Sequence, residues 1–283
     1  MAGHLLIFGE GFTGRCLRQA VEGEGWRVTG TGRTAGEGRL AFDGSSPLPD
    51  AALAGVTHVI ASIPPDDAGD PALRLHAEAL ARLQSLEWVG YLSTTGVYGN
   101  HNGGWVDETT PPAPTSARSR RRVVAEQAWL DWGAGAGKPV QVFRLAGIYG
   151  PGRSALERVQ APGARSVVKP GHAMSRIHVE DIVQIVRAGM AQPHAGPVFN
   201  CSDDEPAPTS DVQAYAARLL GIAPPPEVPF DDADLSPMAR SFYADNRRVC
   251  NDRIKRELGI SLLYPTYREG LRALLPGPAG NTP

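Results

Sequence analysis

The fold of this chain can be inferred from one stretch near its beginning, HLLIFGEGFTGRCLRQAVEGEGWRVTGTGR, which covers residues 4–33. A short apolar run leads into a glycine-rich turn, and apolar residues then recur at the spacing of one helix face. A second short strand-like segment follows at residues 26–29. The stretch therefore predicts a strand, a tight turn, a helix and a second strand.

The turn contains three glycines with the spacing G-x-G-x-x-G. Gly9 permits the tight turn, Gly11 lets the backbone approach a pyrophosphate, and Gly14 lets helix and strand pack closely. The N-terminus of the following helix offers unpaired N–H groups to phosphates. We therefore expect a dinucleotide at this turn, in contact with Gly9, Gly11, Phe12, Thr13 and Gly14.

The end of the second predicted strand bears on which dinucleotide binds. A carboxylate there would bind the ribose 2′-hydroxyl of NAD, but the sequence continues with Thr31, Gly32 and Arg33. Arg33 could pair with the 2′-phosphate of NADP, or it could be an ordinary surface arginine in a turn. We expect NADP rather than NAD as the cofactor, with Thr31 and Arg33 among the cofactor-binding residues.

The first 150 residues continue the same alternation of strand-like apolar runs and helical patterns. This alternation is typical of a parallel sheet that is covered by helices on both faces. After about Gly150 the sequence becomes irregular and richer in polar residues, glycine and proline, although another strand-like run lies near Val198. We predict an α/β fold with a doubly wound parallel sheet and a smaller C-terminal substrate domain.

This pattern also suggests domain boundaries. We assign residues 1–153, with a returning segment near 176–202, to a dinucleotide-binding domain. The smaller substrate-binding or lid portion would then consist of residues 154–175 and 203–283.

The composition argues against several classes of partner. Lys and Arg number 28 against 30 Asp and Glu, so the net charge of −2 gives no overall attraction to nucleic acids or anionic membranes. Cys16, Cys201 and Cys250 are too irregularly spaced to suggest a disulfide framework or a metal site. Without a basic leader or an apolar run of membrane length, we expect a cytoplasmic protein that binds no metal, nucleic acid or membrane.

Several successive motifs resemble the short-chain dehydrogenase/reductase superfamily, in particular its extended and atypical epimerase/dehydratase-like branches. They include LSTTGVYG, FRLAGIYGPGR and RIHVEDIV, and the similarity runs from Leu5 to about Leu275. The resemblance implies a Rossmann fold, a small-molecule substrate and a homodimer formed through two helices that flank the sheet. Because such sheets bind ligands at the carboxyl ends of their strands, we expect further cofactor contacts from Ser62, Ile63, Pro64, Ser93, Ala146, Gly147 and Ile148.

In that family the active site consists of a Ser or Thr after the fifth strand, a Tyr, and a Lys four residues beyond the Tyr. Thr94 resembles the Ser/Thr member of this set. Counting back from Glu126 places Arg118 at the tyrosine position and Arg122 at the lysine position. Since the chain contains no Tyr-x-x-x-Lys at all, the resemblance implies an altered active site.

The replacements change the chemistry that is available. A guanidinium group stays charged at ordinary pH, so Arg118 cannot give and take a proton as a tyrosine would. Arg122 could still hold the nicotinamide ribose. On a helix Arg118, Arg122 and Glu126 share one face, so ion pairs could fix both guanidinium groups, or these charges could simply be solvated.

Other residues are candidate proton carriers. Tyr98 follows Thr94 in TTGVYG, and His172 lies in a loop that faces the substrate in related proteins. His178 of RIHVEDI is expected to cap or brace the next helix rather than to act in catalysis.

We therefore consider three functions. The first is an NAD(P)-binding, epimerase/dehydratase-like oxidoreductase that acts on a small polar metabolite, such as a nucleotide sugar, through an altered active site. The second is a non-catalytic, redox-responsive regulatory protein that binds NADP, which the missing Tyr and Lys support. Nucleic-acid binding through RSRRR, residues 118–122, ranks last because it needs a wider basic surface.

Overall fold

The computed structural model describes residues 3–194 and 196–275, and its centre is a seven-stranded sheet in which every pairing is parallel. The strand order is β11-β7-β5-β4-β1-β2-β3. The strands are β1 (His4–Phe8), β2 (Arg27–Gly32), β3 (Arg39–Ala41), β4 (His58–Ala61), β5 (Trp88–Thr94), β7 (Val140–Leu145) and β11 (Val198–Cys201). The predicted doubly wound α/β fold is thus confirmed, although β2 extends to Gly32, beyond the predicted end at Thr29.

Helices cover both faces of the sheet and bury two separate apolar clusters. One face packs against α1 (Phe12–Glu22), α6 (Val179–Ala191) and α9 (Asp252–Leu258). The other face packs against α2 (Asp50–Leu53), α3 (Pro71–Arg82) and α4 (Ala117–Ala136). Because strands such as β1 are buried along their whole length, their sequences are continuous apolar runs rather than alternating ones.

The order of the strands changes direction beside β1. The strands β2 and β3 follow on one side of β1, and β4, β5, β7 and β11 follow on the other. Open α/β sheets bind ligands outside the carboxyl ends of the strands at such a reversal. The topology therefore points to the end of β1, where the glycine turn follows.

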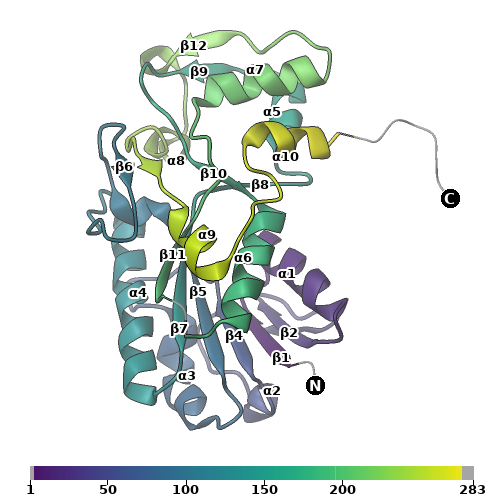
Figure 1. Cartoon of the computed structure of the whole chain (residues 1–283), viewed down its shortest axis with the longest axis vertical. Helices are drawn as coiled ribbons and strands as arrows, with labels where there is room; N and C mark the ends of the chain where they lie inside the picture. The colour runs from purple at the N-terminus through teal and green to yellow at the C-terminus, as the bar shows by residue number, and fades with distance from the viewer. Residues whose placement is uncertain (1–2, 195, 276–283) are drawn as a thin grey trace, which may run out of the picture.

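A smaller portion lies at the end of the sheet where the strands finish, opposite the N-terminus (Figure 1). Its helices α5 (Ala155–Gln160), α7 (Thr209–Leu219) and α10 (Tyr267–Ala273) share an apolar cluster of their own. Three two-stranded sheets accompany it: β8 (Gly147–Tyr149) with β10 (Arg176–His178), β9 (Ser166–Val168) with β12 (Glu227–Pro229), and β6 (Trp105–Val106) with β13 (Arg248–Val249). The remaining short elements are η1 (Thr95–Tyr98), η2 (Phe230–Asp232) and α8 (Pro237–Ser241).

Two sequence-based expectations can be checked at the level of single elements. His178 is the N-cap of α6, where its ring nitrogen Nδ1 accepts from the backbone N–H of Glu180 at 3.3 Å, so the predicted capping role is confirmed. Among the residues that the structure describes, no helix combines the length and the apolar character needed to cross a membrane.

Candidate active site

Each of the three glycines in the turn has the surroundings that a dinucleotide-binding turn requires at its position. Gly9 has φ +87°, a conformation that side chains rarely adopt. A Cβ on Gly14 would lie 3.3 Å from Ile7 Cγ2, so helix and strand are in close contact there. A Cβ on Gly11 would meet no atom within 4 Å, so that space is open to a ligand. The turn therefore fits a pyrophosphate group.

Thr31 contacts the backbone of this turn and does not line the cavity described below. Its side chain is buried, and its Oγ1 accepts a hydrogen bond from the backbone N–H of Gly9 at 3.0 Å. The Thr31 carbonyl accepts a second bond from the Glu10 N–H at 2.8 Å. Thr31 thus fixes the turn relative to β2, which corrects its expected place among residues that contact the cofactor directly.

The end of β2 carries two arginines. Arg33 is exposed and has no side-chain partner within the described part of the chain. Arg39 packs beside Gly32, and its Nε is buried without a hydrogen-bond partner among the described residues. The nearby carboxylate of Glu10 is already paired with Arg18 at 2.7 Å. Sequence reasoning missed Arg39, because only its place in the fold brings it next to the strand end.

A cavity of about 810 Å³ opens beyond the glycine turn, at the carboxyl ends of β4, β5 and β7. This volume is within the range of sites that bind small molecules. Twelve of the predicted site residues line it: Gly11, Phe12, Thr13, Gly14, Ser62, Ser93, Thr94, Arg118, Arg122, Ala146, Gly147 and Ile148. The predicted residues that do not line it are Gly9, Thr31, Arg33, Ile63, Pro64 and Tyr98.

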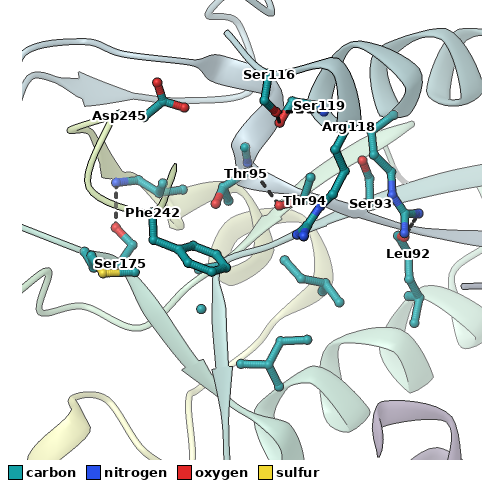
Figure 2. Close-up of a pocket in the computed structure, with 18 of the residues that line it drawn as sticks. Leu92, Ser93, Thr94, Thr95, Ser116, Arg118, Ser119, Ser175, Phe242 and Asp245 are labelled. Carbon is teal, nitrogen blue, oxygen red and sulfur yellow. Dashed lines mark hydrogen bonds between the residues drawn. The ribbon is translucent and has the colours of Figure 1, made fainter. Parts of the chain in front are cut away.

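Thr94 and Arg118 meet in this cavity. Thr94 ends β5, and its Oγ1 accepts a hydrogen bond from the Gly96 N–H at 3.1 Å. Arg118 lies in the first turn of α4, which Ser116 caps by accepting from the Ser119 N–H. The guanidinium group of Arg118 has no hydrogen-bond or ion-pair partner in the described residues, and Figure 2 shows its side chain extending toward Thr94.

Arg122, one turn further along α4, is held in place by its contacts. Its Nη1 donates to Tyr91 Oη at 3.0 Å and to the Leu92 carbonyl at 2.8 Å, and its guanidinium group lies 5.5 Å from the centre of the Tyr91 ring. Burial raises the pKa of Tyr91, so this hydroxyl stays protonated at neutral pH. Arg122 is therefore fixed along β5 while it still lines the cavity.

The ion-pair ladder along α4, one of the two alternatives that helical spacing left open, does not form. Glu126 is buried and pairs with Arg144 of β7 at 2.7 Å, and it also accepts a short hydrogen bond from Ser93 Oγ. Arg122 takes its partners from β5 instead. Helical spacing shows neighbours on one helix and cannot show a partner on a strand beneath it.

The structure does not bring the two other candidate proton carriers into the cavity. Tyr98 is buried, and its hydroxyl donates to Asn200 Oδ1 at 2.8 Å and accepts from Arg144 Nη1 at 2.9 Å. His172 is also buried, with its Nε2 3.0 Å from the Asp245 carbonyl. Burial raises the pKa of Tyr98 and lowers that of His172. Both residues therefore have structural surroundings, which corrects the suggestion that Tyr98 or His172 could carry a proton in the site.

Sequence reasoning missed the opposite wall of the cavity, which residues 241–249 form together with Ser175. Asp245 accepts a hydrogen bond from Thr115 Oγ1 at 2.8 Å, and Arg247 donates to the Gly99 carbonyl at 2.9 Å. These contacts connect the C-terminal half to the loops that follow β5. No motif in this irregular segment could have indicated its position.

Comparison with known proteins shows the family of the chain. The model of the NAD dependent epimerase/dehydratase family matches residues 51–202, so the chain belongs to that family. It is similar to a conserved protein of unknown function from Silicibacter pomeroyi, at 52% identity and a TM-score of 0.88 over 96% of this chain and 98% of that one.

Two further relatives are more distant. Protein YeeZ of Escherichia coli K12 is 26% identical to this chain, and the similarity covers 92% of this chain and 95% of YeeZ. The structure of UDP-glucuronic acid 4-epimerase from Bacillus cereus in complex with NAD superimposes with a TM-score of 0.75 at 17% identity, covering 95% of this chain and 96% of that one. At this identity, the last likeness concerns the fold alone.

Proposed function

We propose that this protein is an NADP-dependent oxidoreductase that acts on a small polar metabolite, with Arg118 and Arg122 in place of the usual Tyr and Lys of its superfamily. The main support is one observation: the Arg118 guanidinium group has no hydrogen-bond or ion-pair partner among residues 3–194 and 196–275, and it extends into the cavity beside Thr94. The open space at Gly11 and the family match support the cofactor part of the proposal.

The roles of the residues follow from their chemistry. The cofactor, when bound, supplies or accepts a hydride. The N–H groups at the start of α1 bind its pyrophosphate, and Arg122 binds the ribose hydroxyls of its nicotinamide end. Thr94 donates to a substrate oxygen, and Arg118 stabilises negative charge on that oxygen. Neither guanidinium group can release a proton at ordinary pH. In the reducing direction the substrate oxygen therefore takes its proton from water, and in the oxidising direction it gives the proton to water.

The preference for NADP rests on the two arginines near the end of β2. Arg33 and Arg39 would contact the 2′-phosphate, and charge-assisted contacts of this kind contribute about 1.5 to 3 kcal/mol each. Titration with NADP and NAD should therefore show a preference for NADP that Arg33→Ala and Arg39→Ala each reduce by about tenfold or more. Arg82, exposed on α3, provides the matched control, because Arg82→Ala removes a distant positive charge. Equal affinities for the two cofactors in the wild-type protein would contradict this preference.

A nucleotide sugar is one candidate substrate, because the chain belongs to the NAD dependent epimerase/dehydratase family. Loss of NADPH absorbance in the presence of substrate panels tests the catalytic part, with Arg118→Gln as the active-site variant. We expect turnover that Arg118→Gln reduces strongly while NADPH affinity is kept. Stoichiometric NADP binding without hydride exchange for any panel member would instead favour the non-catalytic regulatory protein.

A further inference from the structure

One aromatic residue in the cavity is only half covered by the described part of the chain. The side chain of Phe242 is 49% exposed, and it lines the cavity together with Arg118 and Thr94 (Figure 2). Leaving a phenylalanine half exposed forfeits part of the roughly 1.5 to 3 kcal/mol that full burial provides. A concave site is where such a ring can be covered by a ligand.

The position of Phe242 is built into the fold. Its neighbour Tyr243 packs between His172 and Phe230, with ring centres 5.3 and 5.2 Å away. Lys169 Nζ donates to the Tyr243 carbonyl at 2.5 Å and also lies 4.7 Å from the centre of the Phe230 ring. Because Tyr243 is held within the C-terminal half, the adjacent side chain of Phe242 is presented to the cavity.

The segment is also fixed on its other side. Asp245 accepts from Thr115, and Arg247 donates to the Gly99 carbonyl. Both partners belong to the part of the chain that leads from β5 to α4. Phe242 is therefore held opposite Arg118 by contacts to both halves of the molecule.

The cavity is strongly cationic. Its described lining contains four arginines against a single carboxylate, Asp245, and that carboxylate already pairs with Arg247 at 3.3 Å. Arg122 has partners on β5, and Arg153 lies over the Phe12 ring. Arg118 and Arg153 thus keep N–H donors for an anionic group of a ligand, and Arg118 is the one that extends beside Thr94.

The described lining offers a hydroxyl-rich ligand few carboxylate or amide acceptors. No Glu, Asn or Gln is among the described residues that form the wall. Several serine hydroxyl groups are already engaged: Ser62 donates to the Gly9 carbonyl, Ser93 to Glu126, and Ser116 to Ser119. A sugar ring with several hydroxyl groups would therefore find mainly neutral hydroxyl oxygens as side-chain acceptors here, which bind it more weakly than carboxylates do.

We propose that the substrate is a planar organic anion, a small aromatic or conjugated carboxylate, whose ring packs on Phe242 and whose carboxylate binds Arg118. This inference rests on the proposed function and specifies the substrate class of that same cavity. Phe242 is thereby a specificity-determining residue, because it selects planar over hydroxyl-rich ligands.

The test uses three probes on the full chain saturated with NADP: benzoate, cyclohexanecarboxylate and UDP-glucose, each followed by isothermal titration calorimetry. Benzoate should bind more tightly than the other two. Phe242→Ala should weaken benzoate binding by about three- to tenfold, the range expected for loss of a ring contact, whereas Phe242→Tyr should retain it. Arg118→Gln should weaken it by about tenfold or more. Leu263→Ala, at an exposed apolar residue outside the cavity wall, should change nothing.

Several results would overturn the inference: no benzoate binding, benzoate affinity unchanged in Phe242→Ala, or tighter binding of UDP-glucose than of benzoate. Melting temperatures of the variants, measured without ligand, verify that each is folded. NADP titration of the wild-type protein is done first and separately. A failure there contradicts the proposed function, whereas a failure with the probes after normal NADP binding contradicts only the substrate class.

Discussion

Arg118 and Arg122 stand one helical turn apart on α4, yet the structure gives them different surroundings. Arg122 is anchored by Tyr91 and the Leu92 carbonyl, whereas Arg118 is exposed in the cavity with no partner among the described residues. We therefore assign Arg122, which has a fixed position, to the ribose of the cofactor. We assign Arg118, whose guanidinium group can adjust its position, to the substrate.

Gly11 allows a prediction about cofactor binding at the scale of one residue. A valine there would meet no protein atom near its Cβ, so the fold should tolerate it, but the side chain would occupy the space that a pyrophosphate needs. We expect Gly11→Val to abolish measurable NADPH binding in a fluorescence titration. Its melting temperature should fall only slightly, since the change at the N-cap of α1 costs about 1 kcal/mol. Unchanged NADPH affinity would show that the turn does not carry the cofactor.

His172 allows a prediction about pH. Burial lowers its pKa below the ordinary value of 6.5. As the pH falls, the unfolded chain takes up the proton first, so the stability that His172 contributes is complete above about pH 6.5 and is lost below it. Between about pH 7.5 and 5.5, the melting temperature of the wild-type protein should therefore fall further than that of His172→Gln. Parallel declines in the two proteins would exclude this residue as a source of acid sensitivity.

The role of a residue could be predicted where it depends on local backbone conformation, and not where it depends on a contact between distant parts of the chain. The three glycines of the turn lie in the environments that their spacing implied. The partner of Glu126 could not be predicted, because Arg144 lies on β7 and the sequence pattern marks that stretch only as a strand.

At the scale of elements, one buried ion pair connects α4 to the sheet. Glu126 and Arg144 have side-chain exposures of only 5% and 7%, and the carboxylate also accepts from Ser93 of β5. Breaking such a pair leaves an uncompensated charge in a dry environment. The pair therefore fixes the helix on which both site arginines lie.

We expect Glu126→Gln to lower the free energy of unfolding by about 3 to 5 kcal/mol. The exposed pair of Glu78 and Arg82 on α3 provides the control, and Glu78→Gln should change the free energy by less than about 1 kcal/mol. Urea denaturation of both variants measures the difference. Equal small effects would mean that α4 is held mainly by its apolar contacts.

Strands and helices of the first half were predictable because buried parallel strands are continuous apolar runs. The segment that contains α8 and β13 was not predictable. Its residues are held by individual side-chain contacts, such as those of Lys169 and Thr115, rather than by a periodic apolar pattern.

At the scale of the whole molecule, the cavity lies where the carboxyl ends of the strands meet the C-terminal half. The strand topology made the sheet side of this site predictable. The opposite wall, with Phe242 and Asp245, depends on how two halves far apart in the sequence come together. We propose that this wall selects the substrate, and no periodic pattern in the sequence indicates where its residues lie.

The central claim is that Arg122 takes the place of the family lysine on the cofactor. It is tested most directly by NADPH fluorescence titration of Arg122→Ala beside the wild-type protein and Arg121→Ala, whose guanidinium group pairs with Asp67 outside the cavity wall. Arg122→Ala should raise the dissociation constant by about tenfold or more, as expected for the loss of a charge-assisted contact, whereas Arg121→Ala should leave it unchanged. Equal NADPH affinities for all three proteins, each verified to be folded, would contradict the claim.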